Sequence, residues 1–566
     1  MLTKLTGNDI VSFPICAFDT EDNSKGGVLQ LDFCRRINGK LVHDTFTSVT
    51  EAIEFIYSLK EKHLFVAHNL EYDIINLTRD VNYWPIKRMT YTARLISAKL
   101  KGTSHLFVDS FNYYAGSLAD MGKVVGIEKK KMDLSNTEYV ETDTEILFVF
   151  MEQFQERVNT ELGLTISPTI GKMALQTFRR NFLDRDYIPF NDDICRAGYY
   201  GGRCEMFHKG EQYGKIKYAD INSMYPDQMR NEFPDTDTIT EIFDIDTTFG
   251  ISEVTIKIPE SLHIGPLPYR TDKLIYPVGT IRGTWTNHEI RNALEYGCEI
   301  IEYHNGQGTD IGVPVFRKFV EHYYGKRQEA KDDFLKTFYK LLLNSSYGKY
   351  FQHNDYVECR DQQMGRKEEA FLDAKLQKVL GPLYFYEVPM QEPPRTANYI
   401  WGCYVTSYAR IKLYKILTEV HKNAKLLYCD TDSAIYLELP GMEPNLDLDQ
   451  KRLGALKVED YNYANFIMAK GYILRDKEGY KTVCKGVPQP RELEKNKIYS
   501  EENPRYNFLL HGKASFDKPV KLRESASTGE TPNYWREVSK EMRTIYERRN
   551  VYSNGETSPI LIQSSR

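Results

Sequence analysis

The chain of 566 residues lacks the cysteine pattern of a zinc-binding or disulfide-stabilised protein. Its nine cysteines are scattered, form no C-x-x-C pair and have no histidine-rich segment beside them. This argues against a structural zinc site and for a reducing intracellular setting. The first residues, MLTKLTGNDIVSF, lack the apolar core of a signal peptide, and no apolar run is long enough to span a bilayer. We therefore expect an intracellular protein without a membrane span.

An excess of basic residues is also absent. The chain has 74 Lys and Arg against 79 Asp and Glu, which gives a net charge of −5. This balance does not by itself indicate a nucleic-acid binder. However, acidic catalytic clusters lower the net charge, so a local basic groove does not show in the total. Tyrosine and phenylalanine are abundant, at 40 and 28 residues. They fit large cores and interfaces, or stacking on nucleobases, and composition does not distinguish these uses.

Neither an internal repeat nor a low-complexity tract divides the chain, so its organisation comes from strand and helix patterns. At this length we expect three to five domains. Apolar strands at 11–18 and 64–69 alternate with helical periodicity, most clearly at 142–158, which predicts an α/β domain ending near residue 165. Further patterns follow in this order: a strand at 215–221, a β-rich stretch at 232–315, helices at 316–351, and strands at 424–440 and 470–485. The predicted fold class combines α/β and α+β domains.

Carboxylates in the first domain stand at positions that can bring them together. Asp19 and Glu21 are two apart on an extended segment, so their side chains point to the same side. Tyr139 and Asp143 are four apart at the start of a predicted helix and share one face. With Asp73, these carboxylates can hold two divalent cations about 3.5–4 Å apart, and Tyr139 can orient an attacking water.

Each pair alone has an ordinary alternative. A D-x-E at a strand end is more often a solvated loop pair, and a carboxylate at a helix start more often interacts with the helix dipole. Taken singly, neither pair favours the metal-binding interpretation.

A second acidic group consists of Asp220, Asp430 and Asp432. Asp220 follows a short strand in KYADINSMYPDQM, and the other two stand two apart in LLYCDTDSAIYLEL. The latter segment is either a hairpin turn, for which Asp and Ser are favoured, or a metal site. A tight hairpin that projects its carboxylates satisfies both interpretations. Asp220 and Asp432 would then bridge two cations that act on a hydroxyl and a triphosphate.

The segment FLKTFYKLLLNSSYGKY, residues 334–350, favours the catalytic interpretation. At about 100° per residue, one helical face within an arc of roughly 80° carries Lys336, Lys340, Asn344 and Tyr347. A solvated basic face explains the lysines, but not the Asn and Tyr that continue the same stripe. A face that binds a nucleotide explains all four. We expect Gly348 to end this helix.

Together the motifs resemble those of family B DNA polymerases joined to a DEDD-type 3′–5′ exonuclease. The exonuclease series D-x-E, N-x-x-(F/Y)-D and Y-x-x-x-D matches DTE at 19–21, NLEYD at 69–73 and YVETD at 139–143. The polymerase motifs match DINSMYP at 220–226, KLLLNSSYG at 340–348 and YCDTDS at 428–433. Two further elements of the family match YYGGR at 199–203 and KGY at 470–472.

The resemblance implies roles for individual residues, and two Mg²⁺ or Mn²⁺ ions in each active site. The implied metal ligands are Asp220, Ile221 and Asp432 in the polymerase site and Asp19, Glu21, Asp73 and Asp143 in the exonuclease site. Asp430 and Tyr139 complete the catalytic sets. The implied nucleotide-binding residues are Tyr225, Lys336, Lys340, Asn344 and Tyr347. The implied DNA-binding residues are Asn69, Tyr72, Tyr199, Gly201, Gly202, Lys470, Tyr472 and Lys485. The chain departs from its relatives at Asp22, where they commonly carry Thr.

The spacing of the motifs resembles the protein-primed subgroup of small linear-genome bacteriophages and linear plasmids. DTE begins at residue 19, roughly 120 residues separate Asp220 from Lys340, and 86 separate Asn344 from Asp430, which leaves room for two insertions. The implied organisation is an RNase H-like exonuclease domain (1–165) and a right-hand polymerase. The latter comprises palm (166–231 and 402–495), first insertion (232–315), fingers (316–351), second insertion (352–401) and thumb (496–566).

The expected partners are template and primer DNA, dNTPs and a terminal protein whose hydroxyl primes replication. We expect a monomer, or a heterodimer with the terminal protein, in the host cytoplasm. The alternative within the class is a polymerase that extends nucleic-acid primers, or starts without one, in repair or plasmid maintenance. A non-catalytic descendant would have broken carboxylate sets, and both sets are complete here. Basic clusters at 128–132 and 325–331 either contact phosphates or, as the favoured interpretation, are solvated surface.

Overall fold

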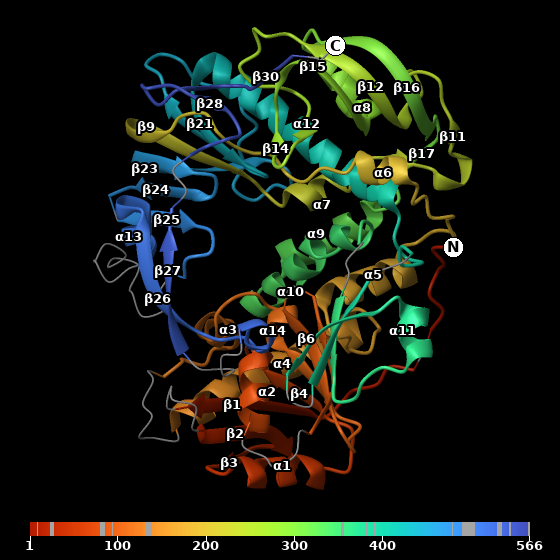
Figure 1. Ribbon diagram of the computed structural model, residues 1–566, viewed down its shortest axis with the longest axis vertical. Coiled ribbons are helices and arrows are strands. Elements are labelled where there is room, and N and C mark those ends of the chain that lie inside the picture. The colour runs from red at the N-terminus through yellow and green to blue at the C-terminus, as the bar shows by residue number, and fades with distance from the viewer. Residues whose placement is uncertain are drawn as a thin grey trace.

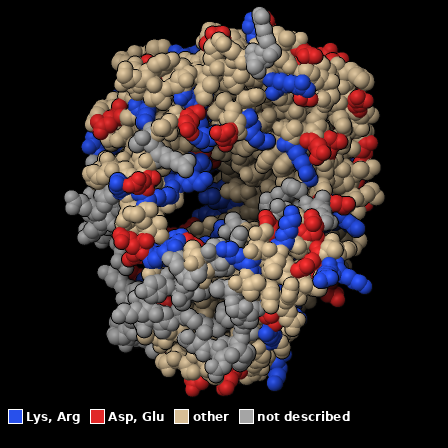
Figure 2. All heavy atoms as spheres, viewed as in Figure 1, with Lys and Arg blue, Asp and Glu red and all other residues tan. Residues whose placement is uncertain are grey.

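The computed structural model describes residues 1–7, 9–22, 28–79, 85–92, 94–130, 138–352, 356–380, 383–389, 392–477, 479–488, 504–528, 535–542 and 545–563. Within them, three larger sheets and a layer of helices (Figure 1) are arranged around a hollow that the space-filling view shows (Figure 2). In the space-filling view of Figure 2, lysine and arginine side chains gather at the walls of this hollow. No helix of the described residues is long and apolar enough to cross a membrane.

The N-terminal region is built on a ten-stranded sheet with the order β19-β20-β18-β5-β6-β7-β4-β1-β2-β3. Its first strands are β1 (Ile15–Asp22), β2 (Val28–Ile37), β3 (Lys40–Phe46), β4 (Leu64–Ala67), β5 (Ile86–Tyr91), β6 (Leu95–Leu100) and β7 (Leu106–Asp109). Its helices are α1 (Val49–Ser58), α2 (Leu70–Arg79), η1 (Ser110–Asn112), α3 (Leu118–Val125) and α4 (Glu138–Glu161). Because successive strand residues face opposite sides, Ala17 packs in the core with α4, whereas Cys16 and Phe18 pack in the core with α1 and α2.

The other three strands of this sheet come from much later in the chain. They are β18 (Tyr356–Arg360), β19 (Lys375–Leu380) and β20 (Leu383–Val388), with α11 (Arg366–Leu372) between the first two. β18 pairs antiparallel with β5, and Val357 lies opposite Tyr91. The region predicted as the second insertion therefore extends the N-terminal sheet.

A seven-stranded sheet with the order β25-β24-β23-β9-β22-β21-β8 lies on the left in Figure 1. Its strands are β8 (Cys204–Met206), β9 (Gly210–Ile221), β21 (Ala424–Asp430), β22 (Ser433–Glu438), β23 (Leu456–Met468), β24 (Gly471–Arg475) and β25 (Tyr480–Cys484). The long helix α12 (Tyr399–Asn423) covers one face, where Leu413 and Leu417 are buried with Leu426 and Tyr436 of the strands.

A five-stranded sheet with the order β11-β16-β12-β15-β30 stands above the centre in Figure 1. Its elements are β11 (Thr240–Glu241), β12 (Phe249–Ile258), β15 (Val278–Thr286), α8 (Asn287–Glu295), β16 (Glu299–Thr309) and β30 (Leu561–Ile562). Short elements beside it are β10 (Phe233–Pro234), η2 (Thr236–Thr238), β13 (Tyr269–Arg270), β14 (Leu274–Ile275) and β17 (Gly312–Val313). β30 comes from the C-terminal end and pairs parallel with β15 at Val278 and Gly279.

A layer of helices connects the sheets. It contains α5 (Ile170–Asn181), α6 (Asp193–Ala197), α7 (Met224–Gln228), α9 (Arg317–Glu329), α10 (Asp333–Asn344) and η3 (Tyr347–Lys349). Aromatic edges join α10 to α4, since the rings of Phe154 and Phe338 lie 5.3 Å apart and those of Phe150 and Phe334 5.5 Å apart. Some of the many phenylalanines of the chain therefore pack in the core.

The C-terminal region closes a ring. It contains α13 (Pro504–His511), β26 (Lys513–Pro519), α14 (Leu522–Thr528), β27 (Trp535–Glu541), β28 (Asn550–Val551) and β29 (Thr557–Ser558). The side chain of Leu522, at 0% exposure, is buried in the core of the N-terminal sheet. Its N–H donates to Glu71 Oε1 at 3.1 Å. The chain thus surrounds the central hollow (Figure 1).

The predicted combination of α/β and α+β domains is confirmed. The predicted domain boundaries stay predictions, although the sheets cross two of them, at β18–β20 and at β30. The strand expected at 11–18 is wrong in its limits. It spans Ile15–Asp22, because its pairing with β2 continues past Asp19 to Asp22.

Two candidate active sites

The Asp430–Asp432 segment is a tight hairpin turn. β21 and β22 pair antiparallel, and Asp430 lies opposite Ser433. Thr431 turns the chain with a φ of 54°, a left-handed conformation that is strained for a β-branched residue. Its N–H donates to the carbonyl of Arg203 at 2.6 Å, which holds the turn against the end of β8.

Asp220 lies beside this turn. β9 pairs with β22 so that Asp220 is opposite Ser433, and the N–H of Ile221 donates to the carbonyl of Asp432 at 2.8 Å. Burial, and then the charge of Asp220, raise the pKa of the Asp432 carboxyl to about 6. Burial also raises the pKa of Asp220, while Lys457, with its Nζ 3.6 Å from Asp220 Oδ2, lowers it. Two neighbouring carboxylates whose pKa values are both raised favour a shared cation.

Asp430 has a different partner. The Nζ of Lys470 lies 3.2 Å from Asp430 Oδ1. Lys470 has a φ of 59°, and its N–H donates to the hydroxyl of Tyr428 at 2.8 Å. A strained backbone therefore holds this ammonium beside the hairpin.

The other implied DNA contacts of this region lie around Lys470. The ring of Tyr472 is buried and lies 5.0 Å from that of Tyr428, so it supports the strands. The N–H of Lys485 donates to the carbonyl of Lys470 at 3.0 Å, and the Lys485 side chain is exposed. Both lysines are therefore placed near the hairpin, and their contact with DNA stays a prediction.

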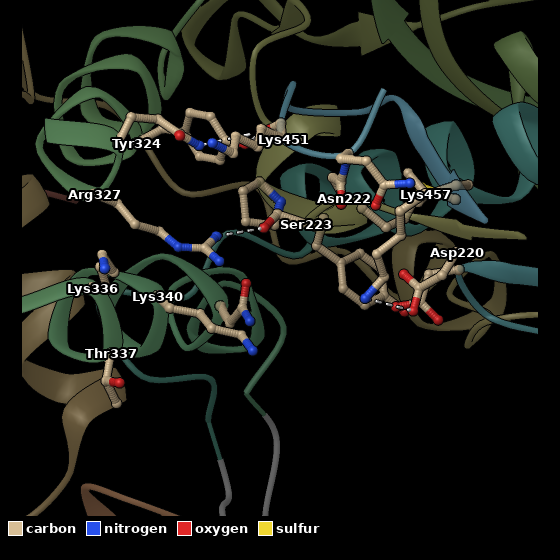
Figure 3. A pocket seen from close by; sticks show the side chains of 18 of the residues that line it. Asp220, Asn222, Ser223, Tyr324, Arg327, Lys336, Thr337, Lys340, Lys451 and Lys457 are labelled. Carbon is tan, nitrogen blue, oxygen red and sulfur yellow. Dashed lines mark hydrogen bonds and ion pairs between the residues drawn. The ribbon is translucent and has the colours of Figure 1, made fainter. Parts of the chain in front are cut away.

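A cleft of about 900 Å³ opens in front of Asp220 and Asp432 (Figure 3). All five residues expected to bind a nucleotide line it, namely Tyr225, Lys336, Lys340, Asn344 and Tyr347. The rings of Tyr225 and Tyr347 stack with centroids 4.1 Å apart and an interplanar angle of 26°. The helical arc predicted from the sequence therefore faces the acidic pair.

The helix that carries this arc ends earlier than expected. α10 stops at Asn344, and Tyr347 and Gly348 belong to the separate turn η3. The prediction that Gly348 terminates the helix is wrong, because Ser345 already serves as the C-cap, with its N–H bonded to the carbonyl of Leu341.

Several cleft residues were missed by the sequence analysis. They are Tyr324, Arg327 and Gln328 of α9, and Gln450, Lys451 and Lys457 of the palm. Arg327 donates to the hydroxyl of Ser223 at 3.3 Å, across the cleft (Figure 3). Desolvation lowers the pKa of Lys340, and the cations of Arg327 and Lys457 lower it further. The basic cluster at 325–331 was the available signal, and its interpretation as solvated surface is wrong for Arg327.

The YYGGR segment lies behind the hairpin. The ring of Tyr199 stacks on Phe351, with centroids 3.6 Å apart and planes at 8°. A Cβ on Gly202 would lie 2.6 Å from Thr431 Oγ1, whereas a Cβ on Gly201 would meet nothing within 4 Å. Gly202 therefore permits the close approach of the hairpin, and Gly201 leaves the backbone accessible.

The second candidate site brings together Asp19 and Glu21 of β1, Asp73 of α2 and Asp143 of α4. Burial and the neighbouring carboxylates raise the pKa of Asp19 well above its usual value, and burial raises that of Asp73. Burial, and next the charge of Asp143, raise the pKa of Glu21 to about 7. Thr20 donates from its N–H and its hydroxyl to Asp73 Oδ1, at 3.0 and 2.8 Å.

Lys129 completes this cluster, and the sequence analysis missed it. Its ammonium forms an ion pair with Asp143 and donates to the hydroxyl of Tyr139 at 3.1 Å. The same ammonium lies 4.4 Å from the centroid of the Tyr139 ring. The basic cluster at 128–132 was the signal, and the solvated interpretation is wrong for Lys129.

The residues expected to bind a 3′ end lie at the start of α2. Asn69 has a φ of 80°, and its N–H donates to Asp109 Oδ1 at 3.2 Å. Burial raises the pKa of Tyr72, and the charge of Asp22 raises it further. The carboxylate of Asp22 also accepts a hydrogen bond from the Tyr72 hydroxyl. The Asp that replaces the common Thr therefore interacts with Tyr72.

Both clusters have the donor chemistry of divalent-cation sites. Among the described residues, no three His, Cys, Asp or Glu side chains are arranged to hold a metal ion as they stand. The polymerase pair has only two carboxylates, and in the second cluster Lys129 and Thr20 engage Asp143 and Asp73. The clustered carboxylates, whose pKa values are raised, nevertheless fit Mg²⁺ or Mn²⁺, because these ions prefer carboxylate and carbonyl oxygens as ligands.

Known proteins share these features. The family model for DNA polymerase type B, organellar and viral, matches residues 127–370. The DNA-directed DNA polymerase of Enterobacteria phage PRD1 is 29% identical over 480 residues, which cover 79% of this chain and 80% of the phage protein. The DNA polymerase of Streptococcus phage Cp-1 is 26% identical over 365 residues, 59% of this chain and 61% of that protein.

Solved structures show the same fold. Phi29 DNA polymerase complexed with primer-template DNA has a TM-score of 0.68 and 17% identity, and the match covers 94% of this chain and 100% of that chain. The ternary complex of the same enzyme with nucleotide substrates has a TM-score of 0.67 and 16% identity, covering 94% and 100%. The predicted arrangement of an exonuclease-like domain and a right-hand polymerase with insertions is confirmed as a fold.

Proposed function

We propose that the chain is a proofreading, protein-primed replicase of the organellar and viral type B DNA polymerases, whose family model matches residues 127–370. DNA synthesis takes place at Asp220 and Asp432, and removal of mismatched 3′ ends takes place at the Asp19 cluster. The observation that carries the proposal is the hydrogen-bonded contact of β9 with the hairpin, which sets two carboxylates at the base of a cationic cleft.

The residues of the cleft have different proposed roles in nucleotide addition. Asp220 and Asp432, with the carbonyl of Ile221, would hold the divalent cations. Lys340 and Arg327 face the same space and neutralise the triphosphate. The stacked rings of Tyr225 and Tyr347 provide a flat surface for the sugar and base. Two bound Mg²⁺ or Mn²⁺ ions would lower the pKa of the attacking hydroxyl and neutralise the departing pyrophosphate.

The exonuclease site is proposed to act on the same primer strand. Asp19, Glu21, Asp73 and Asp143 would hold the cations, and Tyr139 would orient the water. Asn69 and Tyr72 hold the unpaired 3′ end. Lys129 shields Asp143 from the other carboxylates in the arrangement described.

Protein priming is supported by the resemblance to the protein-primed subgroup and by the β-rich region at 232–315, which forms its own sheet beside the palm. We propose that this region engages a terminal protein, and that the strands from 352–401 help to enclose DNA. The enzyme would act as a monomer or with the terminal protein, in the cytoplasm of an infected host. A polymerase that extends nucleic-acid primers, or starts without one, is the alternative.

Two assays test these proposals. Purified protein should extend a primed template with dNTPs and Mg²⁺, and should shorten a mismatched 3′ end when dNTPs are withheld. A protein that does neither would rule out the catalytic proposal. Incubation with a candidate terminal protein and a labelled dNTP should give a covalently nucleotidylated terminal protein on a denaturing gel. Efficient extension of DNA primers without any such product, for the terminal protein encoded beside this chain, would favour the alternative.

A further inference from the structure

A palm turn that leads into β23 contacts the fingers across the nucleotide cleft. The turn comprises residues 449–452, DQKR. It carries Gln450 and Lys451, both of which line the cleft. In Figure 3, Lys451 lies next to Tyr324 of α9. The turn therefore lies where a nucleotide would pass between palm and fingers.

Asn222 anchors this turn from the palm side. Its Nδ2 donates to the carbonyls of Asp449 at 2.9 Å and Arg452 at 3.2 Å. Its backbone exchanges two further bonds, to the carbonyl of Ala455 and from the N–H of Gly454, both at 2.9 Å. Asn222 stands two residues after Asp220, so the turn is tied directly to the catalytic strand.

The turn is also rigid within itself. The N–H groups of Lys451 and Arg452 both donate to Asp449 Oδ1 at 2.7 Å. Gly454 has a φ of 79°, and a Cβ there would lie 2.4 Å from the carboxylate of Asp227. The backbone of Lys451 is therefore fixed even though its side chain is exposed.

The fingers hold the same residue from the other side. The hydroxyl of Tyr324 donates to the carbonyl of Lys451, and Gln328 Nε2 approaches that carbonyl at 3.4 Å. The backbone of Lys451 thus connects α9 to the turn, and Lys451 is among the residues that line the cleft (Figure 3).

The charge of the cleft indicates what this ammonium binds. The lining contains five cationic side chains, Arg327, Lys336, Lys340, Lys451 and Lys457, and two acidic ones, Asp220 and Asp432. Divalent cations bound at the two aspartates would neutralise their negative charge. The five cationic side chains of the lining would then have no acidic side chain of the lining to balance them. A polyphosphate supplies the missing negative charge.

From these contacts we propose that Lys451 binds the phosphates of the incoming nucleotide and of pyrophosphate, and that Asn222 and Tyr324 are its positioning residues. The proposal rests on the nucleotide-binding role proposed for the cleft. It makes the turn at 449–452, which connects the palm to the fingers, part of substrate recognition.

Steady-state kinetics of Lys451→Met, which keeps the apolar stem and removes the charge, test the proposal on primed DNA. KM for dNTP should rise about five- to ten-fold, as expected for loss of one exposed charge-assisted contact, with kcat within about two-fold. The pyrophosphate concentration needed for half-maximal pyrophosphorolysis should rise by a similar factor. Lys451→Arg should restore both values. The neighbouring Arg452→Ala is the matched control, since its guanidinium pairs outside the cleft with Asp447.

Tyr324→Phe keeps the ring and removes the donor to the Lys451 carbonyl. It should raise KM for dNTP about two- to three-fold, and its effect should not add to that of Lys451→Met. Unchanged KM values in an active Lys451→Met would overturn the proposal. So would an equal loss of primer–template affinity or of thermal stability, which would indicate a structural role. If the unaltered chain does not polymerise at all, the proposed function fails instead, and the two failures are distinguishable.

Discussion

The N–H of Ile221 donates a 2.8 Å hydrogen bond to the carbonyl of Asp432, and this bond sets Asp220 beside the catalytic hairpin. The two segments are far apart in the chain, and only the pairing of β9 with β22 brings them together. Carboxylates on paired strands have little freedom to separate. This geometry suits the shared cation site that we propose for them.

The two proposed sites should be separable by mutation. Asp432→Ala should reduce DNA synthesis by at least about a thousand-fold, because it removes a shared ligand of the catalytic cations, and should leave degradation of single-stranded DNA intact. Asp19→Ala combined with Glu21→Ala should do the reverse. Primer extension and exonuclease assays on the same preparations measure both. Loss of both activities in either folded variant would contradict the two-site model.

Gly202→Ala should slow catalysis with little effect on DNA affinity. The added Cβ would lie 2.6 Å from Thr431 Oγ1 and push the hairpin away from Asp220. We expect kcat to fall by roughly ten-fold or more, because a small displacement of catalytic groups has a large effect on rate. Gly201→Ala is the comparison, since a Cβ there meets nothing within 4 Å and any change should appear in DNA binding. Equal kcat values for the two variants would argue against this role of Gly202.

Tyr225→Val should increase incorporation of ribonucleotides. The Tyr225 ring, held by stacking on Tyr347, is proposed to lie under the sugar, where a 2′-hydroxyl would collide with it. Tyr225→Phe keeps the ring and should retain selectivity. The measurement is the ratio of kcat/KM for dNTP and rNTP, and an unchanged ratio in Tyr225→Val would exclude the role.

Stability in the absence of metal should fall as pH rises. Glu21, with a pKa raised from 4.5 to about 7, and Asp432, with a pKa raised from 3.8 to about 6, bind protons in the folded state that the unfolded chain releases at lower pH. Between those values the folded state binds more protons, so its stability decreases as pH increases through 6 and 7. Thermal unfolding in EDTA at pH 5.5 and pH 8 should show this loss.

Glu21→Gln provides the control for that measurement, because it removes a charge and keeps the shape. It should raise the unfolding temperature at pH 8 in EDTA and weaken the stabilisation by Mg²⁺. A larger loss of stability for Glu21→Gln at pH 8 than at pH 5.5 would refute the assignment.

Leu522→Ala should shorten the products made in one binding event. This side chain is buried in the core of the N-terminal domain and closes the ring around the hollow. Truncation should weaken the contact by about 2–5 kcal/mol and let the ring open. Extension in the presence of a DNA trap measures the effect, and Leu510→Ala, at a position 42% exposed, is the control. Product lengths unchanged from those of the unaltered chain would show that Leu522 does not govern retention of DNA.

The amino-acid sequence by itself determined the local chemistry of this protein. The alternation in LLYCDTDSAIYLEL predicts the hairpin, and the helical period at 334–347 predicts the face that lines the cleft. These patterns are readable because the period of a strand or helix is set by backbone geometry, independently of the rest of the chain. The complete carboxylate sets were readable for a different reason, because their ordered motifs resemble those of a known family.

Only the tertiary structure decided which distant segments complete each site. Lys129, Arg327 and Lys451 stand in charged runs that resemble solvated surface, and folding turns them towards carboxylates or the cleft. The addition of β18 to the N-terminal sheet and of β30 to the five-stranded sheet follows from pairing between strands remote in sequence. Such contacts depend on how whole helices and strands pack together, so the local periodicity of the sequence does not predict them.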